Sequence, residues 1–290
     1  MSTLTAIFSE PLAYPFMQRA LLTAVVVAAV CATLSCFLVL KGWSLMGDAV
    51  SHAVFPGIVL AHVAGLPLAV GAFVAGLACA VLTGMLKANS RLKEDTAMGV
   101  VFSGMFGLGL VLFSRIETGQ HLNHILFGDV LGVTGHDLVQ TVVIAAITLA
   151  VVALRWKDLV LFCFDAQHAR AIGLPVGLIH YGLLMLLALT VVAALKAVGI
   201  ILVIAMLIGP GATAFLVSAR FGRMMGVAMA VAIGCAVAGV LLSFHADVAP
   251  GPLIVVLQAG VFCLAFVFAP GRGLLAHARV RRAAAVRNTG

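Results

Sequence analysis

Charged side chains are scarce in this sequence. Asp, Glu, Lys and Arg make up only 9% of its 290 residues, whereas 63% of the residues are hydrophobic. A soluble domain of ordinary composition has about 25% charged residues. The chain has too little polar surface to fold in water, so the composition excludes a soluble globular protein and indicates one that lies in a lipid bilayer.

The common sequence signatures of enzymes are also missing. There is no G-x-x-x-x-G-K-[ST] loop, so the chain does not bind ATP by that route. The H-E-x-x-H and G-x-S-x-G patterns are absent as well, which leaves little support for an intramembrane hydrolase. We therefore expect that the chain is not an enzyme.

The cysteines lack the spacing of a metal or redox motif. None forms a C-x-x-C pair, and all lie within or beside apolar runs. The six are Cys31, Cys36, Cys79, Cys163, Cys235 and Cys263. This pattern predicts small buried hydrophobic side chains, and not disulfides or thiolate ligands.

Long apolar runs dominate what is present. They extend for about 20 residues without strand-like alternation, the length that a helix needs to cross a bilayer. We expect an all-α polytopic membrane protein with a single domain over residues 1–290 and about nine transmembrane helices. The expected spans are 18–40, 45–63, 66–87, 95–114, 137–154, 175–195, 197–218, 224–243 and 251–270. The second contains polar residues and Pro56, so eight spans with a re-entrant segment are the alternative.

The distribution of positive charge predicts the topology. Cytoplasmic loops are enriched in Lys and Arg, and one of the two orientations puts all but Arg19, Arg115 and Lys196 of the 17 basic residues on the cytoplasmic side. The N-terminus is then outside, and the basic tail 271–290 is cytoplasmic. Topology thus explains the net charge of +7, and we expect no nucleic-acid partner.

Two connecting segments are not expected to span the membrane. Outside, residues 115–136 are amphipathic and contain His121 and His124, which face either solvent or an entrance. Inside, residues 155–175 form the longest cytoplasmic connection. Asp165 is a candidate N-cap there, and Gly173 followed by Pro175 is a stop signal. The pattern predicts a short surface helix near 165–172.

Ionisable side chains within a span are costly, so each suggests a function. Asp48 and His52 are four residues apart and share one helix face if the segment is helical, with Ser51 beside them. An oxygen and an imidazole nitrogen suit manganese, iron or zinc better than calcium or magnesium. The alternative is that Asp48 caps the helix and His52 hydrogen-bonds to a neighbouring helix.

Three further positions carry weaker hypotheses. His62 and His180 either extend a metal path or are packing residues, the commoner role of a lone buried histidine. The sequence Gly-Pro-Gly at 209–211 predicts a break in the seventh span, where a cavity or a neighbouring helix satisfies the released backbone groups.

Several ordered blocks resemble the permease subunits of bacterial ABC importers for manganese, zinc and iron. They cover nearly the whole chain: YPFMQRALL at 14–22, LMGDAVSHAVFPGIVLA at 45–61, KEDTAMGVVFSGMFGLGLVL at 93–112, LNHILFGDVLGV at 122–133, ARAIGLPV at 169–176, VGIILVIAMLIGPGATA at 198–214 and DVAPGPLIVVL at 247–257.

This resemblance implies a membrane subunit that moves divalent metal ions by alternating access in the bacterial cytoplasmic membrane. Its G-D-x-x-S-H block implies metal ligands at Asp48 and His52. Its A-R-x-x-G-L-P block implies a coupling helix near 165–174 that docks on an ATPase. The matching residues are Ala169, Arg170, Gly173, Leu174 and Pro175. The implied partners are that ATPase, an extracytoplasmic metal-binding protein and a second permease chain, identical or related; no permanently bound cofactor is implied.

Two rival functions stay open at this point. The first is an importer of the same architecture for a bulkier substrate such as a metal chelate or cobalamin. The second is a secondary transporter or channel that works without an ATPase. Protection of Asp48 and His52 by metal would separate the first from a metal importer, and isolation of an ATPase partner would exclude the second.

Overall fold

The computed structural model describes residues 10–43, 45–115, 130–269 and 273–274. The elements in this part of the chain are helices: α2 (Pro15–Lys41), α3 (Met46–Ala53), α4 (Phe55–Val63), α5 (Leu68–Asn89), α6 (Glu94–Ser114), α8 (Gly135–Leu154), α9 (Trp156–Phe164), α10 (Ala166–Ala171), α11 (Val176–Val198), α12 (Ile200–Val217), α13 (Phe221–Ala246) and α14 (Pro250–Phe268). The all-α prediction is therefore confirmed.

Nine segments in the described ranges are long and apolar enough to span a membrane. Each agrees with its expected range to within a few residues. The second, Met46–Val63, has the lowest mean hydropathy, 1.2, and consists of α3 and α4 joined at Val54. Pro56 has no N–H to donate to the carbonyl four residues earlier, which accounts for the interruption. The segment is thus one span that is interrupted at Val54, and the eight-span alternative is not supported.

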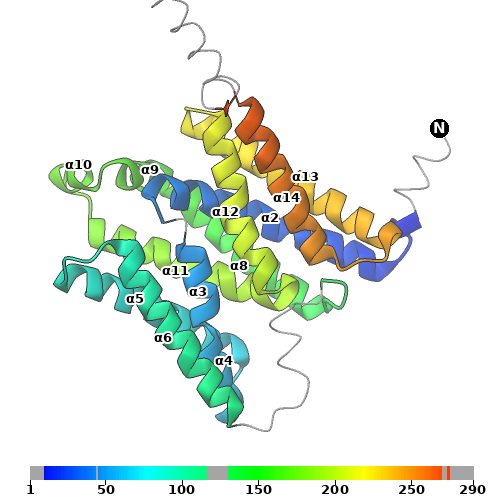
Figure 1. Ribbon diagram of the computed structural model, residues 1–290, viewed down its shortest axis with the longest axis horizontal. Coiled ribbons are helices and arrows are strands. Elements are labelled where there is room, and N and C mark those ends of the chain that lie inside the picture. Colours follow the sequence, from blue (N-terminus) through cyan, green and yellow to red (C-terminus); the bar gives the residue numbers. More distant parts are fainter. Residues whose placement is uncertain (1–9, 44, 116–129, 270–272, 275–290) are drawn as a thin grey trace, which may run out of the picture.

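Helix α2 is the centre of the bundle. It packs against α8, α12 and α13, and 72% of its most apolar window is buried (Figure 1). Ala20, Ala24 and Ala28 follow at four-residue intervals and are fully buried. Small side chains on one face let neighbouring helices approach closely, so this sequence places α2 in the core.

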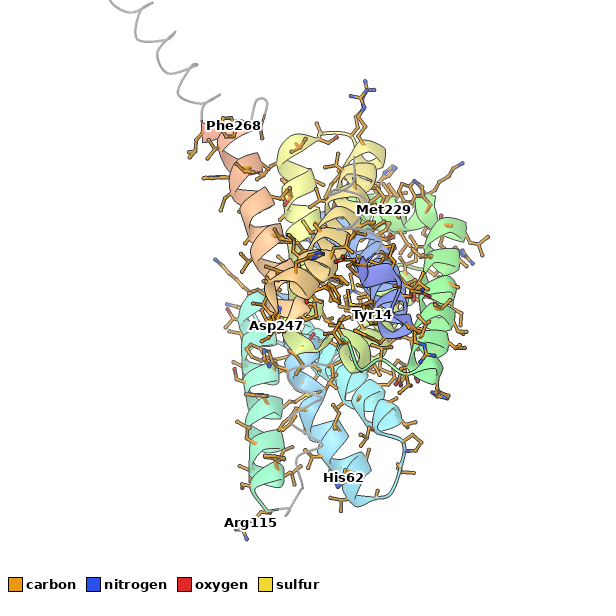
Figure 2. All side chains as sticks on the ribbon, turned by 90° about the vertical axis from the view of Figure 1, so that its right-hand side faces the viewer. Tyr14, His62, Arg115, Met229, Asp247 and Phe268 are labelled. Carbon is orange, nitrogen blue, oxygen red and sulfur yellow. The ribbon has the colours of Figure 1, made fainter. Side chains whose placement is uncertain are left out.

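Helices α3 to α6 form a second group, called here the α3–α6 lobe. Figure 2 shows His62 and Arg115 at the tip of this lobe, far from Phe268. Helices α4 and α5 cross where Gly57 and Gly71 face each other, and a Cβ atom on either would collide with the backbone of the other helix. The lobe is joined to the α2 bundle by α3, which contacts α11 and α12, and by α5, which contacts α11.

The predicted break in the seventh span is wrong, because α12 continues through Pro210. A neighbouring helix does bind the local backbone, as expected. Ser35 of α2 accepts a hydrogen bond from the N–H of Gly211 at 3.0 Å and donates one to the carbonyl of Ile208 at 3.3 Å. These two bonds stabilise the helix at its proline.

All six cysteines have free thiols, and five of them are buried as predicted. The prediction is wrong for Cys263, which is exposed on α14. Only 17% of the span of α14 is buried, so this side chain faces outward from the bundle. Burial raises the pKa of Cys163 to about 12, so this thiol stays protonated and is a poor metal ligand.

Candidate functional site

Asp48 and His52 lie side by side on α3. The Oδ1 atom of Asp48 is 3.3 Å from Nε2 of His52, and the side chains are 32% and 30% exposed. Most other residues of α3 are buried, so this pair is its polar, accessible face. Two ligand atoms that each bind one ion at about 2.1 Å, at 90–109° to each other, lie about 3.0–3.4 Å apart. The observed separation fits a shared ion.

Asp48 does not cap α3. The N-cap residue is Leu45, and no side chain makes a cap hydrogen bond there. The carboxylate lies in the first turn, where the partial positive charge of the helix N-terminus stabilises an anion. The capping alternative is therefore wrong, and the carboxylate oxygens keep their capacity to bind a cation.

Aromatic rings hold His52. Its ring centroid is 5.1 Å from that of Phe106 and 6.2 Å from that of Phe102, both on α6. Its Nδ1 atom is buried and has no hydrogen-bond partner among the described residues. The alternative of a hydrogen bond to a neighbouring helix is thus wrong, and the imidazole is oriented by these rings and by its 3.3 Å contact with Asp48.

Ser51 points into the protein. It is fully buried, and its hydroxyl donates to the carbonyl of Gly47 at 2.7 Å. That bond uses the only hydroxyl proton, so a cation would meet a lone pair. Ser51 stays a prediction as a secondary ligand.

The other histidines lie elsewhere. His62 is exposed near the end of α4, ten positions after His52 or about 15 Å along a helix. His180 packs edge-to-face on Trp43, with ring centroids 5.0 Å apart, in a different cavity. His121 and His124 lie outside the described residues. No group of three or more His, Cys, Asp or Glu residues in the described ranges has metal-binding geometry, so Asp48 and His52 stand as a pair there and not as part of a larger cluster.

The predicted short helix near 165–172 is confirmed as α10, whereas its cytoplasmic location stays a prediction. Asp165 is its N-cap, and Oδ1 accepts hydrogen bonds from the N–H groups of Gln167 and His168, both at 2.9 Å. The bond from His168, then that from Gln167, lowers the pKa of Asp165 below its usual value. The carboxylate is therefore charged at neutral pH.

The end of α10 also follows the sequence. Gly173 has φ +85°, a conformation that favours glycine, and Leu174 donates its N–H to the carbonyl of Ala169. Pro175 is the N-cap residue of α11. Ala169 is fully buried and anchors the helix, whereas Arg170 is exposed. The helix thus presents a charged side chain from a rigid base.

Sequence reasoning missed the role of Phe102 and Phe106. Both lie in an apolar run of α6 and read as ordinary lipid-facing or core residues. Their four-residue spacing repeats that of Asp48 and His52, which is the only signal that pointed to a shared face.

Comparison with known proteins gives matches over nearly the whole chain. The model of the ABC 3 transport family matches residues 13–269. The "Chelated iron transport system membrane protein YfeD" of Yersinia pestis is 62% identical, over 92% of this chain and 90% of that protein. The "Manganese transport system membrane protein MntB" of Synechocystis is 50% identical, over 92% and 87%. In the structure of PsaBC from Streptococcus pneumoniae in complex with Fab, one chain superposes with a TM-score of 0.83 at 37% identity, over 93% of this chain and 98% of that one.

Proposed function

We propose, because the chain belongs to the ABC 3 transport family, that it imports divalent transition-metal ions and binds each ion in transit between Asp48 and His52. The chain is a multi-pass membrane transport subunit of an ABC system, in which the ATPase is a separate subunit. The observation that carries the proposal is the 3.3 Å approach of a carboxylate oxygen and an imidazole nitrogen on the accessible face of α3.

The names of the relatives, together with the donor set, favour manganese or iron as the transported ion. The relatives are named for manganese and for chelated iron. Both ions accept mixed oxygen and nitrogen ligands, and zinc does so too, so zinc stays a prediction from the donor set alone. An ion held by two ligands and water exchanges readily, which is what passage requires.

The mechanism we propose is alternating access driven by a partner. An extracytoplasmic metal-binding protein delivers the ion to a pair of permease chains, identical or related. ATP binding and hydrolysis in the ATPase move α10, and Asp48 with His52 faces one side of the membrane at a time. The capped, anchored helix α10 supports this role because a rigid element transmits force. Ala169, Arg170, Gly173, Leu174 and Pro175 would shape its docking surface.

One relative's name gives a second candidate, an importer of chelated iron. A chelate carries its own ligands, so Asp48 and His52 would then be dispensable. The free-ion and chelate functions therefore differ in what they require of this pair.

Uptake measured in cells tests the proposal. Cells that lack the chain should lose accumulation of manganese, iron or zinc when each is supplied as a free ion. The Asp48→Asn variant should restore less than a tenth of the uptake, because it removes the charge and keeps the shape. Asp158→Asn, at a surface ion pair with Arg155, should restore it fully. Normal uptake by Asp48→Asn, in a complex that still copurifies with the ATPase, contradicts the metal path and favours the chelate.

A further inference from the structure

A cavity of about 440 Å³ lies away from Asp48 and His52. It opens between the last turns of α2 and α5, the segment α9–α10 and the first half of α11, at the end of the molecule where α9 and α10 lie (Figure 1). We call it the basic cavity and define it by Lys41, Trp43, Thr83, Lys87, Arg170 and Tyr181. Asp48 and His52 are not among the residues that line it.

Positive charge lines the basic cavity. Lys41, Lys87 and Arg170 come from three different elements, and none of the lining residues in the described part of the chain is acidic. Lys41 is held at the wall, since its Nζ atom lies 4.1 Å from the centroid of the Phe162 ring and donates to the Phe162 carbonyl at 3.3 Å. Such a lining attracts an anion.

One residue of the cavity lining, Trp43, has a buried donor without a partner among the described residues. Trp43 is 2% exposed, and its Nε1–H has no acceptor among the described residues. Buried polar groups are nearly always hydrogen-bonded, and an indole N–H can only donate. The missing partner is therefore an acceptor. Thr83, a residue that is also 2% exposed, lines the same cavity. Cations beside neutral donors are the chemistry that binds phosphate oxygens.

The side chains around the cavity indicate that it lies at the level of the lipid headgroups. Trp and Tyr gather at the level of lipid headgroups, and the cavity contains Trp43 and Tyr181 beside His180. Its remaining wall is apolar, with Met46, Ala80 and Leu184. A soluble phosphate ion would make no favourable contact with an apolar wall, whereas the glycerol and acyl chains of a lipid would pack against it.

We propose that the basic cavity binds the phosphate headgroup of an acidic phospholipid. Basic pockets between transmembrane helices on the cytoplasmic side are suited to such headgroups, and the positive charge predicts that this end of the bundle is cytoplasmic. A phosphate between Lys41 of α2 and Arg170 of α10 would tie the short helix to the bundle. The inference does not depend on which ion is transported.

Tryptophan fluorescence in vesicles tests the proposal. The chain has only two tryptophans, so the fluorescence of the Trp156→Phe variant reports on Trp43 alone. Trp156 packs on Phe37 and Phe221, and phenylalanine keeps an aromatic ring there. The full chain is placed in phosphatidylcholine vesicles that contain increasing fractions of brominated phosphatidylglycerol or, as reference, brominated phosphatidylcholine. Bromine quenches a tryptophan that it touches. We expect the acidic lipid to quench Trp43 at lower fractions.

Two variants and a control locate the binding. Lys41→Gln should lower the preference for phosphatidylglycerol about fivefold, the contribution of one cation near the membrane surface. Gly84→Leu should abolish it without changing any charge, since a Cβ atom there would point at Tyr181 Oη and His180 Nε2, 3.8 and 3.9 Å away. Lys157→Gln removes an exposed lysine of α9 outside the cavity and should change nothing.

Three results would overturn the proposal. Equal quenching by the two brominated lipids shows that no headgroup is selected. Loss of the preference on adding millimolar inorganic phosphate assigns the cavity to a soluble anion. Loss of the preference for phosphatidylglycerol on adding the ATPase subunit assigns the basic cavity to an acidic side chain of that protein.

Discussion

At the scale of single residues, His52 illustrates what packing does for a binding group. In the described part of the chain no hydrogen bond fixes the buried Nδ1 atom of the imidazole, and two phenylalanines of α6 help to orient the ring. Sequence spacing predicted that Asp48 and His52 share a helix face, because four residues make about one turn. It could not predict the phenylalanines or the bond from Ser35 to α12, because these contacts join residues that are distant in the chain.

Truncating Phe106 should therefore weaken transport. The Phe106→Ala variant frees the imidazole, and loss of a group that orients a metal ligand costs about 10- to 100-fold in metal affinity. Uptake measured against ion concentration should show a raised KM. The matched control is Phe113→Ala, which also removes a phenyl ring from α6. The ring of Phe113 packs against Phe55 and makes no ring contact with His52 in the described part of the chain. Equal effects of the two changes would refute a specific role for Phe106.

At the scale of elements, glycine contacts decide how closely the helices approach. The crossing of α4 and α5 leaves no room for a side chain at Gly57, whereas Gly104 on α6 has open space around it. This difference could not be predicted from the sequence, because a glycine within an apolar helix has the same sequence context in either setting. Helix limits were predicted well, since apolar length and capping residues are local properties.

The Gly57→Ala variant should destabilise the protein by about 1–3 kcal/mol, the usual cost of overpacking a tight contact. Gly104→Ala should be neutral or slightly stabilising, because alanine favours a helix. Equilibrium unfolding in detergent micelles measures both. A Gly57→Ala variant as stable as the parent would show that α4 and α5 do not pack closely in the membrane protein.

Helix α10 should respond to acid through its cap. The folded pKa of Asp165 is lowered by the N–H groups that it accepts, so the carboxylate stabilises the helix above its unfolded pKa of about 3.9. That contribution is lost as the pH falls through the lower, folded pKa. Hydrogen exchange of the Gln167 and His168 amides, corrected for intrinsic rates, should show falling protection in this acidic range.

The control for this prediction is Asp165→Asn, which keeps a capping oxygen and does not titrate. Its protection should not vary with acid. If the parent and this variant share the same pH profile, titration of Asp165 does not control α10.

At the scale of the whole molecule, the composition dictates an all-helical membrane protein with nine spans in the described ranges, and the structure and the family agree. How the helices are arranged was not predictable, because nearly every span is apolar all round and no periodic face reveals its neighbours. The proposed site lies where α3, with its polar pair, meets α6 and joins the two groups of helices. A small displacement between the groups would change its surroundings, which suits alternating access.

The most direct test is to identify the atoms that bind the ion. Manganese is loaded into the purified permease–ATPase complex, and pulsed electron paramagnetic resonance detects nitrogen coordinated to it. We predict a nitrogen signal that disappears in His52→Gln and persists in His180→Gln, together with weaker binding in Asp48→Asn. Bound manganese without coordinated nitrogen, or a nitrogen signal that survives His52→Gln, would contradict a shared site on α3.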